Sequence, residues 1–208
     1  MNKKQLLAYK VALDDAYDQK KAEQVKKELL SQITEKDKLK KEFWPLFEDG
    51  TCTVGTPDFN LILANIPTFE KNIGKEKLDE FLFSAYSRAL FPHLNRNKER
   101  QTVSLDELKQ QIGKLDFQKK NDLLSLCDIA GLVAQGDVNQ LVSKVEEKAA
   151  TLTGNDLSSM LMAFGAMRDK ATKADYNRMV AAAEKMMANP ANSEMKNYLE
   201  YYVESWKH

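Results

Sequence analysis

Residues 123–149 read LLSLCDIAGLVAQGDVNQLVSKVEEKA, a stretch with two apolar patterns separated by Gly136 and Asp137. On either side of this pair, apolar side chains recur at intervals of three and four, at Leu123, Leu126, Cys127, Ala130 and Val133 and then at Val138, Leu141, Val142, Val145 and Ala149. This spacing places each set along one face of a helix. Glycine often ends a helix and aspartate often precedes one. The stretch therefore predicts two antiparallel helices joined by a tight turn.

The same apolar spacing recurs along most of the chain. Further helical faces are predicted over residues 6–17, 22–33, 59–73, 78–89, 157–164, 176–187 and 195–206. Few residues separate successive helices, and helices joined by short turns lie antiparallel to their neighbours. The chain is therefore predicted to form a series of helical hairpins.

Single residues mark where several of these helices begin and end. Thr56-Pro57 and Ser104, which opens a Ser-Leu-Asp-Glu capping-box sequence, are typical of the start of a helix. Gly74 is predicted to stop the helix before it. Pro92 is also predicted to end a helix, because proline lacks the backbone N–H and its ring clashes with the preceding turn.

The composition favours helices over sheets. The 208 residues include 25 Leu and 20 Ala, but only 25 Val, Ile and Thr together. Leu and Ala lose little side-chain freedom in a helix, whereas β-branched residues favour strands. Gly and Pro contribute only 13 residues, which is too few for a hairpin-rich sheet protein. An all-α fold is predicted.

The predicted all-α fold is a stack of antiparallel helical hairpins, because a helix with one apolar face must bury that face against neighbours. The arrangement is either a tetratricopeptide-like α-solenoid or an irregular helical array, since turns near residues 18, 74, 136 and 172 are unevenly spaced. Charged residues predict an exposed linker over 95–103. This linker would separate N-terminal hairpins in 1–94 from C-terminal hairpins in 104–208, with one continuous domain over 1–208 as the alternative.

The balance of charge excludes some classes of partner. There are 31 basic and 31 acidic side chains, and the formal net charge is zero. The chain therefore lacks the long-range attraction that nucleic acid or an anionic membrane surface requires. No apolar run approaches the roughly 18–20 residues that cross a bilayer. An amphipathic, acidic segment over residues 6–18 does not fit a secretion signal. Neither nucleic-acid binding nor membrane insertion is predicted.

No group of residues forms a recognisable reaction centre. Cys52 and Cys127 lie far apart in sequence and are expected to be free thiols, with Cys127 buried, although a disulfide between them is the alternative. His208 is the last residue, and His93 lies at a predicted helix end, where a capping or surface role is expected. No catalytic, metal-ligating or cofactor-binding residue is predicted, and no cofactor. An enzyme of unrecognised type that uses His93 or Cys127 is the alternative.

Aromatic residues gather near the end of the chain. Tyr198, Tyr202 and Trp206 share one predicted helix face, and Tyr201 points away from them, so that its ring is expected to be exposed. Tyrosine and tryptophan are enriched among the residues that dominate binding energy at interfaces. These four residues are the candidate contacts for a partner, with closure of the end of the helical stack as the alternative role.

Four segments in the first half of the chain resemble part of a known family. They read LLAYKVALDDAYD over 6–18, KAEQV over 21–25, EFWPLF over 42–47 and FEKNIGKEKL over 69–78. Together they are similar to the helical region that follows the thioredoxin domain in thioredoxin-family proteins of Bacteroidetes, and the resemblance covers about residues 6–91. It implies a tetratricopeptide-like tail, a cell-envelope location and an N-terminal thioredoxin-like domain of the same gene product as partner. The Trp-Cys-x-x-Cys motif of that domain is absent from this sequence, so the resemblance transfers no catalytic residue.

The sequence therefore predicts a non-catalytic helical module for interaction or scaffolding, with a protein or peptide as its partner. Stacked helical hairpins create an extended surface that suits such partners. A structural spacer that positions an attached redox domain is one alternative. The enzyme that uses His93 or Cys127 is the other.

Overall fold

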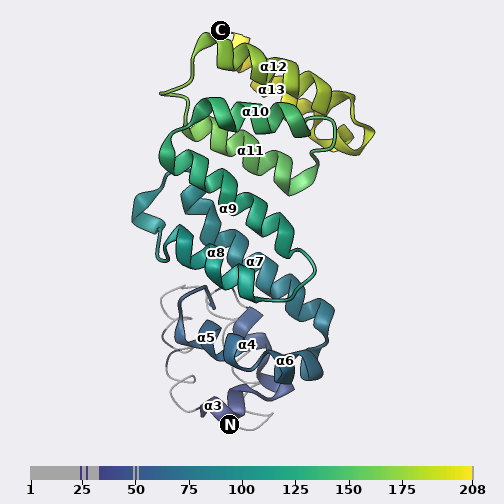
Figure 1. Ribbon diagram of the computed structural model, residues 1–208. Helices are drawn as coiled ribbons and strands as arrows, with labels where there is room; N and C mark the ends of the chain where they lie inside the picture. Colours follow the sequence, from purple (N-terminus) through teal and green to yellow (C-terminus); the bar gives the residue numbers. More distant parts are fainter. Residues whose placement is uncertain (1–23, 25–26, 28–32, 49, 51, 208) are drawn as a thin grey trace. The chain divides into compact units, whose positions relative to one another are not determined.

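The computed structural model describes residues 24, 27, 33–48, 50 and 52–207, and the regular elements over this part of the chain are all helices (Figure 1). Their bounds are α3 (Glu35–Lys38), α4 (Pro45–Glu48), α5 (Pro57–Ala64), α6 (Ile66–Ile73), α7 (Lys75–Leu94), α8 (Leu105–Lys114), α9 (Lys120–Gln135), α10 (Val138–Lys148), α11 (Gly154–Ala166), α12 (Lys173–Ala188) and α13 (Lys196–Lys207). Short 3₁₀ helices are η1 (Lys41–Phe43), η2 (Lys98–Arg100) and η3 (Pro190–Met195). The predicted all-α class is confirmed. The predicted helices over 6–17 and 22–33 fall almost wholly outside the described residues.

Most predicted helix boundaries are confirmed by hydrogen bonds of the residues that suggested them. The Thr56 hydroxyl accepts a hydrogen bond from the Phe59 N–H at 3.3 Å, and a carboxylate oxygen of Asp137 accepts one from the Gln140 N–H at 3.0 Å. Gly136 ends α9 in the left-handed backbone conformation with φ +73°, which residues other than glycine rarely adopt. These contacts are local, and sequence spacing alone is enough to predict them.

The prediction that Pro92 ends its helix is wrong. Helix α7 continues through Pro92 to Leu94, and Pro92, His93 and Leu94 are all buried. A proline in the last turn removes one backbone hydrogen bond, and the burial of these neighbours offsets that cost. The carbonyl of Pro92 accepts hydrogen bonds from the Asn97 N–H at 2.9 Å and from the Gln101 side chain at 3.1 Å.

The chain divides into two compact units, residues 1–85 and 86–208, which are called unit 1 and unit 2 below. The division lies inside α7, whereas the sequence analysis placed it at a linker over 95–103. None of the residues in 95–103 is buried, and three of them form η2. The predicted division into 1–94 and 104–208, and its alternative of one continuous domain, stay predictions.

The described part of unit 1 has an aromatic core. The indole of Trp44 lies 5.1 Å from the Phe81 ring and 5.6 Å from the Phe69 ring, measured between centroids. Phe47 adds an edge-to-face contact with Phe69 at 5.5 Å. These rings are buried, and edge-to-face packing is among the preferred aromatic geometries. Elements α4, α6 and α7 are therefore held together largely by carbon surface.

Unit 2 is a succession of packed helices in which contacts join both successive helices and helices two apart in sequence. Helix α9 packs on α8, α10 and α11, helix α10 also packs on α12, and α12 packs on α13. The apolar faces predicted from residues 123–149 are buried between these helices. None of the described helices is both long enough and apolar enough to cross a membrane.

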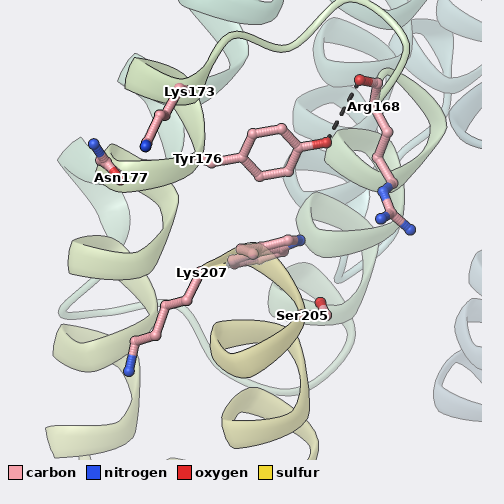
Figure 2. Close-up of a pocket in the computed structure, with 7 residues that line it drawn as sticks. Arg168, Lys173, Tyr176, Asn177, Ser205 and Lys207 are labelled. Atoms are coloured by element: carbon pink, nitrogen blue, oxygen red, sulfur yellow. Dashed lines mark hydrogen bonds between the residues drawn. The ribbon is translucent and has the colours of Figure 1, made fainter.

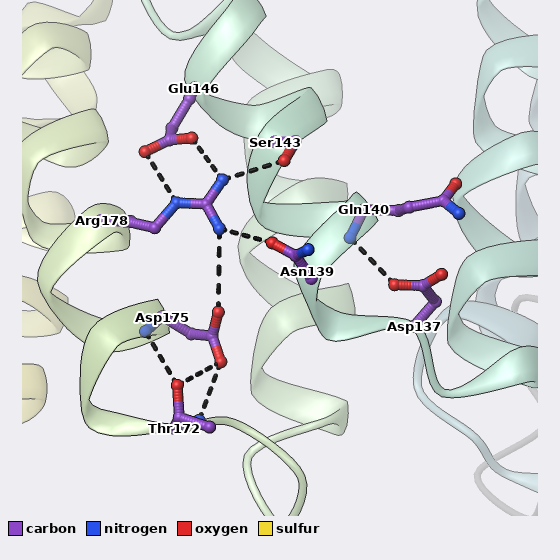
Figure 3. Close-up of polar contacts among 8 residues, drawn as sticks. All are labelled: Asp137, Asn139, Gln140, Ser143, Glu146, Thr172, Asp175 and Arg178. Atoms are coloured by element: carbon purple, nitrogen blue, oxygen red, sulfur yellow. Dashed lines mark hydrogen bonds and ion pairs between the residues drawn. The ribbon is translucent and has the colours of Figure 1, made fainter.

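Arg178 fixes the position of α12 against α10 (Figure 3). Its guanidinium donates to both carboxylate oxygens of Glu146, at 3.0 and 2.6 Å, and also to Asn139 at 2.7 Å and Ser143 at 2.9 Å. The planar fork of arginine suits such a bidentate carboxylate contact. Because α12 packs in turn on α13, this network holds in place one wall of the candidate site described next.

Candidate functional site

The four aromatic residues proposed as partner contacts all lie on α13, but they differ in exposure. Tyr201 is 71% exposed and Tyr198 is 42% exposed, while Tyr202 is half-buried and Trp206 is only 6% exposed. The opposite side of α13 buries Leu199 and Val203. The expected exposure of Tyr201 is confirmed, and Trp206 serves mainly as a packing residue.

A continuous row of rings leads from the surface of α13 into the core of unit 2. The row consists of Tyr198, Tyr202, Trp206, Phe164 and Tyr176, and successive ring centroids lie 4.9, 5.2, 5.3 and 5.4 Å apart. Tyr201 contacts this aromatic row through Tyr202, at 5.9 Å. The hydroxyl oxygens of Tyr198 and Tyr202 lie 3.1 Å apart, within hydrogen-bond distance. The rings of the two exposed tyrosines thus pack against Tyr202, which in turn packs against Trp206.

A pocket of about 430 Å³ opens at the far end of the aromatic row, and it is called the basic pocket below (Figure 2). It is lined by Arg168, Lys173, Tyr176, Asn177, Ser205, Trp206 and Lys207. Figure 2 shows the ring of Tyr176 between Lys173 and Asn177 on one side and Arg168 on the other. The Tyr176 hydroxyl donates a long hydrogen bond of 3.5 Å to the carbonyl of Arg168, which connects α12 to the loop after α11.

The basic pocket has an excess of positive charge. Three cationic side chains line it and no carboxylate does. Of the acidic residues nearest in sequence, Asp169 pairs with Arg96 at 2.9 Å and Asp175 accepts from Thr172 at 2.7 Å, whereas Glu204 pairs with Lys207 of the pocket at 3.3 Å. Within the part of the chain that the structure describes, neither Arg168 nor Lys173 forms an ion pair. Two cations are therefore available to a ligand.

Tyr202 contributes no charge at neutral pH. Burial raises the pKa of Tyr202 to about 12, and the hydrogen bond with Tyr198 acts in the same direction. The phenol is therefore protonated under physiological conditions. The charge of the site comes from its arginine and lysines alone.

His93, one of the two residues considered for an enzyme, has a structural contact. It is buried, at 9% exposure, and not at the surface as the sequence analysis allowed. Its Nε2 lies 3.0 Å from the carbonyl oxygen of Val103, and that oxygen can only accept, so Nε2 holds a proton. The imidazole thus ties the end of α7 to the segment before α8.

Cys127, the other residue considered for an enzyme, borders a second pocket of about 380 Å³ between α8, α9 and α10. Its thiol is buried, and that burial raises its pKa to about 11. A thiol with so high a pKa is protonated at neutral pH and is a poor nucleophile. His93 does not line this pocket. Cys127 is a free, buried thiol, as expected, so the alternative disulfide with Cys52 is not formed, and Cys52 is buried as well.

Over the described residues, no three His, Cys, Asp or Glu side chains are close enough together to hold a metal ion. Comparisons of this chain with protein-family models, with curated proteins and with solved structures found no match. The functional assignment therefore depends on the arrangement of the residues themselves.

The sequence analysis missed the cationic residues of the pocket. Arg168, Lys173 and Lys207 come from the loop after α11, the start of α12 and the end of α13. Each looks like an ordinary surface residue in the sequence, because no spacing connects them. Tyr176 did belong to a predicted apolar face, yet it is only half-buried at the pocket, and that combination is visible only in the structure.

Proposed function

We propose that this chain is a non-catalytic helical interaction module that binds a protein or peptide at the C-terminal end of unit 2. The contact surface is formed by Tyr198 and Tyr201 together with the basic pocket. The observation that supports this most is the exposure of these two tyrosines, 42% and 71%, on α13, the helix whose last turn lines a pocket of about 430 Å³. Large exposed aromatic side chains are characteristic of binding surfaces.

The packing of the aromatic row favours binding further. Tyr198 packs edge-to-face on Tyr202, and Tyr202 packs on Trp206, so the exposed rings are already ordered before a partner arrives. An ordered side chain loses less conformational entropy on binding than a mobile one. Tyrosine also offers a large amphipathic surface with few rotatable bonds. The face is thus suited to bind without reorganisation.

The resemblance to thioredoxin-family tails, which covers residues 6–91, stays a prediction. It supports a thioredoxin-like domain of the same gene product as one partner, and a cell-envelope location. Much of the matching sequence lies outside the described residues. The proposal of a binding face on α13 is independent of it.

A peptide selection tests the proposal. A random peptide library displayed on phage is selected against the whole chain, and the affinity of selected peptides is then measured by fluorescence anisotropy. The double variant Tyr198→Ala/Tyr201→Ala is expected to bind them at least about tenfold more weakly, since an interface aromatic commonly contributes more than about 1 kcal/mol.

A matched control distinguishes binding at Tyr198 and Tyr201 from non-specific binding to any exposed aromatic residue. Phe91 is also a large exposed aromatic of unit 2, at 48% exposure, but it lies on α7. Phe91→Ala is expected to leave peptide affinity unchanged within twofold. Failure to select any binding peptide, or equal affinity of the wild-type chain and the tyrosine double variant, would contradict the proposal.

A further inference from the structure

We propose that the basic pocket binds the carboxylate side chains of an acidic peptide segment, while apolar residues of the same segment pack on the adjoining aromatic row. This inference rests on the proposed function and adds the chemistry of the partner. It assigns the pocket to a segment rich in Asp or Glu, interrupted by apolar residues.

Two cations of the basic pocket support an acidic ligand. Arg168 and Lys173 form no ion pair with the described residues, although the chain as a whole has as many acidic as basic side chains. In such a balanced chain, a pocket lined by three cations and no carboxylate is a local excess of charge. An acidic ligand supplies the missing counter-charges, and arginine is especially suited to carboxylates because its donors match both oxygens.

The acidic residues on α13 do not oppose this charge. Glu204 pairs with Lys207 at 3.3 Å, and Glu200 lies 4.0 Å from Lys196 on the same helix. Each of these carboxylates is thus largely balanced by a lysine of its own helix. Asp169 is likewise neutralised by Arg96. The field at the pocket is therefore set mainly by Arg168 and Lys173.

The arrangement of the residues that line the pocket also supports an acidic peptide. Figure 2 shows Arg168 and Lys173 on opposite sides of the Tyr176 ring, with the amide of Asn177 near Lys173 and the hydroxyl of Ser205 below Arg168. Two separated cations with an aromatic surface between them suit a ligand with more than one carboxylate and an apolar group. A volume of about 430 Å³ lies within the range of about 300–1,000 Å³ typical of ligand pockets.

A peptide fits these features better than a nucleic acid. Nucleic-acid surfaces use many cations in a row to follow the phosphates, and the net charge of this chain is zero. Here two cations without an ion pair among the described residues line a pocket together with Tyr176 and Trp206, which belong to the aromatic row that extends to Tyr198. Acidic and apolar side chains on one extended peptide can contact both parts together.

The test is a fluorescence anisotropy titration of the whole chain at low ionic strength. The probe is a fluorescein-labelled decapeptide in which glutamate alternates with leucine, and the matched probe has glutamine in place of each glutamate. The acidic peptide is expected to bind at least tenfold more tightly. The variant Arg168→Gln/Lys173→Gln is expected to lose at least tenfold of that affinity.

A charge-matched control isolates the pocket from the overall charge. Lys98→Gln/Lys185→Gln removes two positive charges from η2 and from a later turn of α12, and neither residue lines the pocket. It is expected to keep the affinity within twofold. An equal loss in both double variants would overturn the assignment, because it would show non-specific attraction. Tighter binding of a labelled thymidine decanucleotide than of the acidic peptide would also overturn it.

The result separates this inference from the proposed function. If library-selected peptides depend on Tyr198 and Tyr201 but are neutral, and Arg168→Gln/Lys173→Gln binds them normally, the acidic partner is wrong and the interaction module stands. If neither the acidic probe nor any selected peptide binds, both are wrong.

Discussion

The two units of the chain use aromatic rings in opposite ways. In unit 1, Trp44, Phe47, Phe69 and Phe81 are all buried and form a cluster of hydrocarbon surface. In unit 2, the aromatic row runs from half-buried Tyr176 through buried Phe164 and Trp206 to exposed Tyr198 on α13. The difference indicates that the first cluster stabilises its unit, whereas the outer end of the second is exposed and is the surface that we propose for a partner.

The largest effect expected from this comparison is on stability, at Trp44. Trp44→Ala is expected to destabilise the chain by about 3–5 kcal/mol, because it leaves a cavity among rings that cannot close around it. Urea unfolding followed by circular dichroism measures the change. Tyr201→Ala, at the exposed end of the aromatic row, is expected to cost less than about 0.5 kcal/mol. Similar losses from the two substitutions would remove the distinction between the clusters.

A second prediction concerns pH, and it uses a buried polar group that is not at the binding face. Burial raises the pKa of Cys127 to about 11 from its ordinary value of 9.0. Between these values the unfolded chain releases the thiol proton and the folded chain retains it, so stability falls as pH rises above about 9. The loss by pH 11 is expected to be about 2 kcal/mol.

Cys127→Ala is expected to remove this part of the alkaline loss. The loss that Tyr86 and Tyr202 cause above about pH 10, where burial also raises their pKa values, is expected to remain. Urea unfolding of both chains at several pH values between 8 and 11 measures the difference. If the free energy of unfolding depends on pH in the same way in the variant and in the wild-type chain, the Cys127 thiol is not buried as described.

A third prediction concerns how much the Arg178 network contributes to the stability of unit 2. Arg178→Lys loses the bidentate contact with Glu146 and is expected to destabilise unit 2 by about 1 kcal/mol, a modest value because the pair is partly solvent-exposed. Lys109→Gln, which breaks a single ion pair with Asp128 at 2.7 Å, is expected to have a smaller effect. Urea unfolding compares the two. A larger loss from Lys109→Gln would contradict the account of the network.

The helices could be predicted from sequence because their signals are local. Thr56, Asp137 and Gly136 act on residues three or four positions away, and apolar spacing defines each buried face. Pro92 was misjudged because burial of His93 and Leu94, a tertiary effect, kept α7 helical beyond it. The predicted division at 95–103 stays a prediction, and the boundary between the two compact units lies within α7.

The candidate site could be predicted only in part. The exposure of Tyr201 followed from its position out of phase with Tyr198 and Tyr202 on one helix. The basic pocket did not follow, because Arg168, Lys173 and Lys207 come from the loop after α11, from α12 and from α13, and only tertiary packing brings them to one pocket. The spacing of apolar residues indicates which residues face the core. It does not indicate which surface residues from different helices lie next to one another.

The most direct test of the central claim is the affinity of one library-selected peptide for the wild-type chain and for Tyr198→Ala/Tyr201→Ala, measured by anisotropy on chains whose circular dichroism spectra match. The account predicts at least a tenfold loss of affinity in a variant that is still folded. An unchanged affinity in that folded variant would show that the exposed tyrosines of α13 are not a binding face.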